Sequence, residues 1–402
     1  MDPKALQSAA AARGSNYYLT GIPDGPLPFV FEAGLPDPTT FPSAELGRLF
    51  TDVLGADAAE LQYGSPIDGD LGYGNIGLRR LLAQRTLEID GRAVDHAGVM
   101  LTSGGVQGIA EAVAAFLDPG DHAVVEAPTW DYTLRAIQAT GAEATAIPID
   151  DHGMQIDLLE QHIARLAASG ERLKLVYIIA TFNVPTAVSL SEERRRRLVT
   201  LAQEHRFVII EDNVYADLRY DGERLPSLYS LDDAGFVVKV DSFSKTMMPA
   251  LRLGWVTGDP AAIDAMARVR RDLGVSQLIA RAIARFVGEG RYEPHIASVC
   301  KLYRTKRDAV AAALEQHCTG TMTWNNPAGG YFFWLELADD IDGKAVQRAA
   351  FMEGVLCRPG ERFYGEPEHG KQRLRLAFTM APVADLERAV EILGKSAATN
   401  RR

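Results

Sequence analysis

The sequence predicts an α/β protein with a large, mostly parallel sheet flanked by helices, followed by a smaller α+β domain. Short apolar runs alternate with longer amphipathic stretches through the middle of the chain. This rhythm stops near residue 290, where a long helical stretch leads to aromatic-rich runs typical of strands. The first stretch is rich in proline, as in PLPFVFEAGLPDPTTFP, which favours an irregular arm. We therefore expect an N-terminal arm at 1–45, a large domain at 46–289 and a small domain at 290–402.

Seven apolar runs are expected to form the strands of the large sheet. They are Val99–Thr102, His122–Glu126, Ala144–Pro148, Leu173–Ile179, Phe207–Ile210, Phe236–Val240 and Leu253–Thr257. Helices are expected between them, among others at Gln107–Phe116, Thr129–Ala139 and Glu192–His205. The last of these has a start signal, because Ser189 or Ser191 can cap it. Its four arginines, Arg194–Arg197, are expected on a solvated face beside acidic neighbours.

The small domain is expected to begin with a long helix over Pro294–Gln316. The run TMTWNNPAGGYFFWLEL follows, and then a helix near Lys344–Glu353. The segments GVLCRPG and QRLRLAFTM and a last helix complete it. This mixture predicts a second, smaller α+β unit.

Composition and charge exclude several classes of protein. The 402 residues are 47% hydrophobic and 24% charged, as in ordinary globular proteins, and the net charge of −11 provides no general field for nucleic acid. No window approaches about 18 uninterrupted apolar residues, which argues against a membrane span, and the N-terminus lacks the apolar core of a signal peptide. The three cysteines are far apart and lack metal-ligand spacing. We expect a cytoplasmic protein that binds neither membranes nor nucleic acid, without a metal site.

The segment DSFSKTMMPALRLGW, residues 241–255, has the strongest chemical signal. It places Lys245 after a predicted strand, among the hydroxyls of Ser242 and Ser244, with Arg252 seven residues further on. Hydroxyls and a guanidinium can bind a phosphate. A lysine that is partly desolvated beside them has a lowered pKa and can form a Schiff base.

Asp212, in VIIEDNVYADLRY, follows a buried strand, and Tyr215 lies three residues later. A carboxylate at the carboxyl end of a parallel strand lies where ligands bind in open α/β sheets. There Asp212 could hold a protonated ring nitrogen, although it could equally cap a turn. Trp130, in EAPTWDY, could stack on a planar ligand or pack in the core.

The glycine-rich turn in LTSGGVQGIAEAV leads from a predicted strand into a helix. The N–H groups of Gly104, Gly105 and Val106 could form an anion site there, or the segment could be a plain tight turn. It matches neither the dinucleotide-binding nor the P-loop pattern. Together, the four segments point to a planar, phosphorylated, aldehyde-bearing cofactor with a ring nitrogen.

These motifs resemble those of fold-type I pyridoxal-phosphate (PLP) enzymes of the class I/II aminotransferase family. The most similar branch contains the 2-aminoadipate and kynurenine aminotransferases. The resemblance runs from about Phe29 to the C-terminus and rests on SFSKTMMPALRLGW and the D-x-x-Y spacing. It implies PLP as the cofactor, with Lys245 forming the Schiff base and moving the proton. It further implies that Asp212 binds the ring nitrogen, and Tyr215 the ring O3′.

The resemblance also implies the other contacts of the site. Phosphate ligands would be Ser242, Ser244, Arg252 and the N–H groups of Gly104, Gly105 and Val106. Trp130 would stack on the ring, Arg375 in RLRLAF would grip the substrate α-carboxylate, and Gly34 would lie where the arm approaches the substrate. Such enzymes are usually homodimers with shared active sites. Tyr63 would reach the phosphate across the dimer interface, and Tyr73 competes with it for this role.

The sequence departs from the family pattern at two places. The family reads F-Q-N-P-T-G where this chain has Phe182-Asn183-Val184-Pro185-Thr186-Ala187. Val184 replaces an asparagine that donates to O3′, and such a hydrogen bond is worth about 1.5–3 kcal/mol. Asn183 could compensate if the loop shifts by one residue. The stretch 63–80 is longer than usual, and forms either a harmless extension or a lid for a particular substrate.

The expected function is therefore PLP-dependent transfer of the amino group of an L-α-amino acid. The alternative keeps the cofactor but changes the outcome. It is a specialised biosynthetic enzyme doing elimination, replacement, cyclisation or oxidation through a quinonoid, on S-adenosylmethionine or another amino acid. A PLP-binding transcription regulator is disfavoured, because about forty residues are too few for a winged helix-turn-helix and the chain is acidic.

Overall fold

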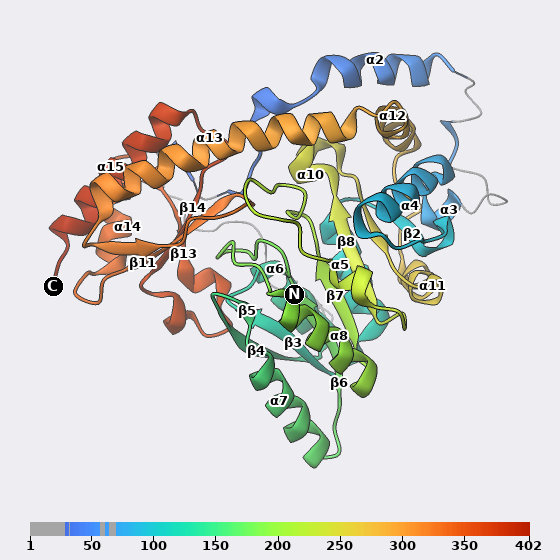
Figure 1. Ribbon diagram of the computed structural model, residues 1–402, viewed down its shortest axis with the longest axis horizontal. Helices are drawn as coiled ribbons and strands as arrows, with labels where there is room; N and C mark the ends of the chain where they lie inside the picture. The colour runs from blue at the N-terminus through green and yellow to red at the C-terminus, as the bar shows by residue number, and fades with distance from the viewer. Residues whose placement is uncertain (1–28, 32, 57–60, 64–69) are drawn as a thin grey trace, which may run out of the picture.

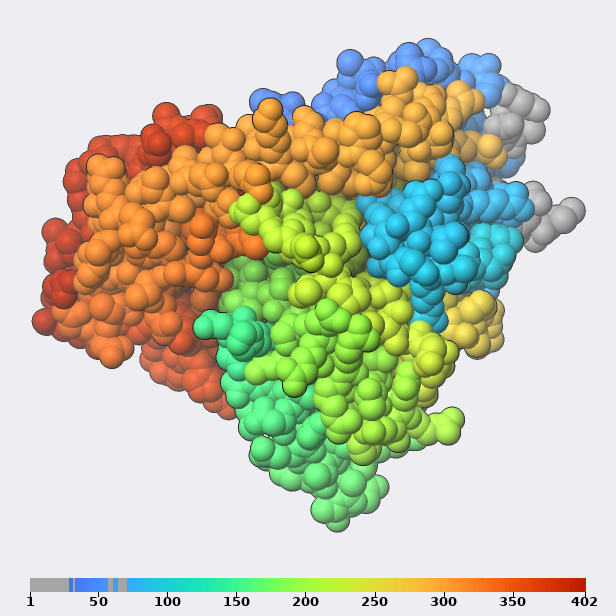
Figure 2. Space-filling model, viewed as in Figure 1, coloured from blue at the N-terminus to red at the C-terminus, as the bar shows by residue number. Residues whose placement is uncertain are grey.

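The fold is described from a computed structural model of the chain. The structure describes residues 29–31, 33–56, 61–63 and 70–402. Figure 1 shows a central sheet with helices on both faces, and a second sheet near the C-terminus beneath a long helix. In Figure 2 the orange and red C-terminal part packs directly against the green and yellow central part. No helix among these residues has the length and apolarity needed to cross a membrane.

The large sheet has the strand order β2-β9-β8-β7-β6-β3-β4-β5. Its strands are β2 (Val99–Thr102), β3 (His122–Ala127), β4 (Glu143–Asp150), β5 (Gly153–Met154), β6 (Leu173–Ile178), β7 (Val208–Asp212), β8 (Val237–Ser242) and β9 (Gly254–Thr257). Pairing is parallel from β8 through β4, whereas β9, β2 and β5 run antiparallel to their neighbours. The predicted mostly parallel sheet is confirmed. It has eight strands instead of seven, because the hairpin after β4 adds the two-residue strand β5.

Both faces of the sheet are buried at its central strands β6, β7 and β8, which explains why these read as mainly apolar runs. In β6, Leu175 and Tyr177 face one apolar layer, while Val176 and Ile178 face the other. The first layer contains side chains of α5 (Gly105–Phe116), α6 (Asp131–Thr140) and α11 (Pro260–Val269). The second contains those of α7 (Ile156–Ala168), α8 (Glu192–His205) and α9 (Leu228–Leu231). A third apolar cluster joins the β2 edge to α2 (Ser43–Leu54), α4 (Ile76–Asp90) and α12 (Gln277–Gly288).

Helix α8 has the predicted bounds, and its cap is the second of the two candidates. The Ser191 side chain accepts from the backbone N–H of Arg194. The expectation of a solvated arginine face is wrong for Arg195, which is fully buried. Its guanidinium donates to the carbonyls of Leu190 at 2.8 Å and Pro226 at 3.0 Å. Backbone carbonyls from neighbouring loops therefore solvate the buried guanidinium, and the buried carboxylate of Glu211, at 3.9 Å, balances its charge.

The second sheet is antiparallel, with the order β10-β11-β14-β13. Its strands are β10 (Met322–Trp324), β11 (Phe332–Leu337), β13 (Arg358–Pro359) and β14 (Arg373–Ala377). The accompanying helices are α13 (Tyr292–Cys318), α14 (Gly343–Met352) and α15 (Val383–Thr399). Short α-helices also form at α3 (Asp70–Tyr73) and α10 (Phe243–Thr246), and short 3₁₀ helices at His96–Gly98, Pro249–Leu251, Gly360–Phe363 and Pro367–Gly370. The antiparallel sheet and its helices agree with the predicted smaller α+β unit.

The described part of the N-terminal arm is more regular than predicted. β1 (Phe29–Val30) pairs in parallel with β12 (Val355–Leu356), and a short 3₁₀ helix covers Pro38–Thr40. Asp37 forms a buried ion pair with Lys306 of α13, at 2.7 Å. The arm is thus attached to the C-terminal part of the chain and runs past the end of the large sheet.

Candidate active site

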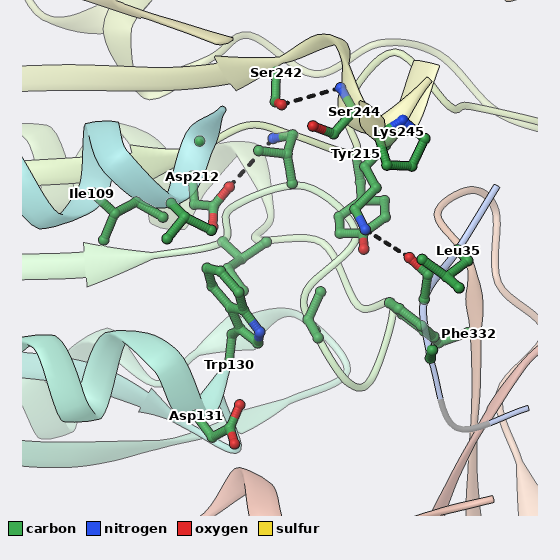
Figure 3. A pocket seen from close by; sticks show the side chains of 18 of the residues that line it. Leu35, Ile109, Trp130, Asp131, Asp212, Tyr215, Ser242, Ser244, Lys245 and Phe332 are labelled. Atoms are coloured by element: carbon green, nitrogen blue, oxygen red, sulfur yellow. Dashed lines mark hydrogen bonds between the residues drawn. The ribbon is translucent and has the colours of Figure 1, made fainter. Parts of the chain in front are cut away.

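A cavity of about 370 Å³ lies where the arm, the large sheet and the C-terminal part meet. Asp212, Ser242 and Trp130 reach it from the carboxyl ends of β7, β8 and β3, as expected for a ligand site in an open α/β sheet. Gly34 and Arg375 complete it from the arm and from β14. Figure 3 shows Asp212, Ser242 and Trp130 on the same cavity as Lys245 and Tyr215.

Lys245 lies on α10, a single helical turn that Ser242 caps at the end of β8. Its ammonium donates to the carbonyl of Gly34 at 2.6 Å. Burial, together with the nearby Arg375, lowers the pKa of Lys245 to about 8, although Asp212 opposes the shift. A substantial fraction of the amine is therefore neutral near physiological pH, as a nucleophile requires.

Asp212 ends β7 and is only 2% exposed. Burial raises its pKa to about 6, and a hydrogen bond from Tyr177 opposes that rise. The Tyr177 hydroxyl donates to Oδ2 at 2.6 Å. Sequence reasoning missed Tyr177. Tyr177 of β6 pairs with Ile210 of β7, and Ile210 precedes Asp212 by two residues. The register of these two neighbouring strands is the signal that could have indicated the contact.

An anion cradle lies at the start of α5. Gly104 has a φ of +80°, and a Cβ there would lie 2.8 Å from Arg252 Nη2. Arg252 donates to Ser244 Oγ at 3.4 Å and to the Ser103 carbonyl at 2.8 Å. The N–H groups of Gly105 and Val106 are in the first turn of α5, where no intrahelical acceptor exists.

One expected phosphate contact is corrected. The N–H of Gly104 donates to the Thr102 carbonyl at 2.8 Å, within its own turn, and Gly104 does not line the cavity. Gly104 therefore supports the cradle through its backbone conformation, because a side chain at this position would displace Arg252.

The end of the cavity at Arg375 has aromatic walls. The Arg375 guanidinium lies 4.1 Å from the ring centroid of Phe332 and 5.0 Å from that of Phe363. Tyr215 packs edge-on against Phe332, with its centroid 5.7 Å away. Trp130 forms another wall. A Cβ on Gly34 would lie 2.6 Å from Phe332, so only glycine fits there without displacing that ring.

The sequence departs from the family pattern in the turn at 182–187. This turn places Val184 on the cavity wall, whereas Asn183 does not line the cavity. The Asn183 amide donates to Glu126 Oε2 at 2.9 Å, and its Oδ1 accepts from the Thr186 hydroxyl at 2.9 Å. The expected contact of Asn183 with the cofactor is therefore wrong. Its side chain is held inside the turn, and the loop does not shift by one residue.

Neither candidate for the contact across a dimer interface lines this cavity. Tyr63 is 69% exposed on the surface, whereas the Tyr73 hydroxyl donates to Asp264 at 2.8 Å. Which of the two tyrosines reaches the phosphate of a neighbouring subunit stays a prediction. Of the long stretch 63–80, residues 64–69 lie outside the described residues.

A profile of the family described as "Aminotransferase class I and II" matches residues 68–393. An aromatic-amino-acid aminotransferase of Thermococcus litoralis is 35% identical, over 90% of this chain and 86% of its own length. The chain belongs to the class I and II aminotransferases. This membership confirms the predicted family, and the chain is a PLP-dependent enzyme of that family.

Two solved structures support the same assignment for this aminotransferase. A Pyrococcus horikoshii kynurenine aminotransferase, crystallised with PMP, is 33% identical with a TM-score of 0.86, over 92% of this chain and 91% of its own. An alpha-aminoadipate aminotransferase of Thermus thermophilus, complexed with N-(5′-phosphopyridoxyl)-L-leucine, is 26% identical with a TM-score of 0.88, over 99% of both chains. The predicted fold type and cofactor are therefore confirmed.

The cavity of this aminotransferase fits PLP on its own geometry. It offers an amine with a lowered pKa, a buried carboxylate, and a glycine turn that leaves room beside an arginine. Of the described residues, no group of three or more histidine, cysteine, aspartate or glutamate side chains could hold a metal ion. Bound PLP supplies an electron sink for the negative charge that develops when the substrate loses its α-proton.

Proposed function

We propose that this enzyme transfers the amino group of an L-α-amino acid, with Lys245 as the residue that binds the cofactor and moves the α-proton. The lowered pKa of Lys245, within a cavity shared with Asp212 and Arg375, carries the proposal. A neutral amine at this place would hold the cofactor through its aldehyde group, and would be the group that accepts the α-proton of the substrate and returns it.

The other residues would hold the two reactants in place. Asp212 would keep the ring nitrogen protonated, and Tyr215 would donate to O3′. Ser242, Ser244, Arg252 and the N–H groups of Gly105 and Val106 would bind the phosphate. Arg375 would bind the α-carboxylate with two parallel hydrogen bonds, and Trp130 would stack on the ring. These roles agree with the lining of the cavity.

The experiment adds a panel of amino acids to the cofactor-loaded enzyme. Absorption and product analysis should show stoichiometric conversion of the aldehyde form of the cofactor into the pyridoxamine form, with one equivalent of 2-oxo acid. A second oxo acid should restore the aldehyde form. Failure of every amino acid to yield an oxo acid, in an enzyme that holds its cofactor, would contradict the proposal.

One observation favours a second candidate, a specialised biosynthetic reaction on the same cofactor. Val184, only 5% exposed, offers an aliphatic side chain at the place where the family has a donor to O3′. The product distinguishes the two candidates. An eliminated, replaced, oxidised or cyclised product with the aldehyde form retained, for example from S-adenosylmethionine, would support the second candidate against amino transfer.

We also propose that the enzyme is a homodimer with shared active sites. Large apolar side chains are exposed together around one surface cleft, with Leu54 at 58%, Tyr63 at 69% and Leu273 at 59%. Contiguous apolar surface of this kind marks an interaction site. Light scattering should give the mass of a dimer, and Tyr63→Phe should weaken cofactor retention. Unchanged retention in a dimer would count against the shared site.

The proposed boundaries remain 1–45 for the arm, 46–289 for the large domain and 290–402 for the small domain. They are supported by α13, which begins at Tyr292 and leads into the second sheet. A cytoplasmic location and the absence of nucleic-acid binding stay predictions. The three cysteines are free thiols, which agrees with a reducing compartment.

A further inference from the structure

Asp131 lines the cavity but has no part in the roles proposed above. It is the first residue of α6, directly after Trp130, and is 8% exposed. Figure 3 shows it next to Trp130 at the edge of the cavity, away from Lys245. Its Oδ2 accepts from Arg135 at 3.0 Å and from Arg358 at 3.4 Å. Its Oδ1 is buried and has no hydrogen-bond partner among the described residues.

A buried carboxylate oxygen without a donor is rare in folded proteins, because burial removes the water that would otherwise solvate it. Both arginines bind the other oxygen, so Oδ1 is left without a donor in the described part of the chain. A donor that arrives with the substrate would pair it. Because Asp131 also lines the cavity, a bound substrate could supply the donor that Oδ1 lacks among the described residues.

The sheet register places Asp131 close to the proposed α-carboxylate site. Its partner Arg358 lies in β13, directly opposite Arg375 in β14. Opposed residues of antiparallel strands have Cα atoms about 4.5–5.5 Å apart. An amino acid held by Arg375 would therefore lie beside Arg358 and near Asp131, in a cavity that Trp130 and Phe363 also line.

Charge decides which donor fits. The carboxylate already has two arginine partners, so the group of three has a net charge of +1. A cationic side chain would be repelled by both guanidinium groups, whereas an uncharged O–H or N–H donor would not. The aromatic walls favour a planar or apolar body for that side chain.

We propose that Asp131 forms the side-chain subsite, and selects amino acids whose uncharged side chain ends in an O–H or N–H donor. The proposal rests on the proposed function, because it takes Arg375 as the α-carboxylate site. Substrates of this class combine an apolar body with a polar tip, as in a phenol. Asp131 acts as a specificity residue and takes no part in proton transfer.

The test uses two carboxylates that cannot react, 3-(4-hydroxyphenyl)propionate and 3-phenylpropionate, which differ by one hydroxyl. Their dissociation constants for the cofactor-loaded enzyme are measured by calorimetry. The hydroxylated ligand should bind about tenfold more tightly or better, as expected for a hydrogen bond to a charged group. Asp131→Ala should bring the ratio to about 1, whereas Asp131→Asn, which keeps an acceptor oxygen, should give an intermediate ratio. Asp151→Ala, at an exposed aspartate, should leave the ratio unchanged.

Three results would overturn the inference. The unchanged enzyme could bind the two ligands equally, or the ratio of their dissociation constants could stay the same in Asp131→Ala. The third is that 5-guanidinopentanoate binds more tightly than either of the two phenyl ligands. The near-ultraviolet circular dichroism of each variant shows whether it has folded. If amino acids still yield oxo acids while the ratio is 1, this inference alone fails. If no amino acid yields an oxo acid, the proposed function fails first.

Discussion

Replacing Tyr177 by phenylalanine should shift the pH dependence of cofactor binding toward higher pH. The Tyr177 hydroxyl is fully buried and donates to Asp212 at 2.6 Å, which stabilises the ionised carboxylate. Hydrogen bonds to charged groups contribute about 1.5–3 kcal/mol. One pKa unit corresponds to about 1.4 kcal/mol, so Tyr177→Phe should raise the pKa of Asp212 by about one to two.

The sign follows from the form of Asp212 that binds the cofactor. The ionised carboxylate pairs with the protonated ring nitrogen, so affinity falls as pH falls through the pKa of Asp212. In the cofactor-free enzyme burial raises this pKa to about 6, and affinity should weaken below that pH. In Tyr177→Phe the same decline should begin about one to two pH units higher.

The assay is equilibrium binding of PLP to cofactor-free enzyme between pH 5 and about 9, with Tyr220→Phe as the matched control. Tyr220 is also buried, but its hydroxyl donates to the Gly330 carbonyl and does not touch Asp212. Titration of the cofactor itself affects both variants equally. A coincident pH profile for the two variants would refute the assignment of Tyr177 as the positioning residue for Asp212.

Three further predictions concern the same cavity. Arg375→Gln should raise KM for amino acids by about 100-fold or more, with cofactor binding unchanged, because two charge-assisted hydrogen bonds to the carboxylate are lost; unchanged KM in steady-state assays would exclude this role. Val184→Asn should restore a donor to O3′, so the pH at which the absorption spectrum of the bound cofactor changes should fall by about one unit or more. If that pH is the same in the variant and the unchanged enzyme, residue 184 does not reach O3′. The rate of covalent cofactor attachment should rise with pH and level off above about 8, because the neutral Lys245 amine is the nucleophile and burial lowers its pKa to about 8; a flat stopped-flow profile would contradict this.

The architecture was predictable because each strand of the large sheet is an apolar run bounded by polar or glycine-rich segments. The central strands are buried on both faces, so they read as continuous apolar runs that stand out from the segments between them. β2 and α8 have the predicted bounds. The strand β5 escaped prediction because two residues carry no periodic signal. The pairing of Phe29–Val30 with Val355–Leu356 is a contact between distant segments, which local patterns do not encode.

Site residues that a motif and its spacing identify were predictable. Residues whose contacts depend on tertiary packing were not. Lys245 and Asp212 follow strands that point to one edge of the sheet, so their meeting follows from topology. Tyr177 and Asn183 lie in apolar or turn segments, and only the packed structure shows which polar group each one contacts. Arg195 belongs to a run of four arginines, and only the neighbouring carbonyls reveal that it is buried.

The most direct test of the account is the site at which the cofactor is attached. The cofactor-loaded enzyme is reduced with borohydride, digested, and the modified peptide is identified by mass spectrometry. The account predicts one phosphopyridoxyl group, on Lys245, and none in Lys245→Ala despite retained secondary structure. Attachment to another lysine, or equal labelling of the Lys245→Ala variant, would contradict it.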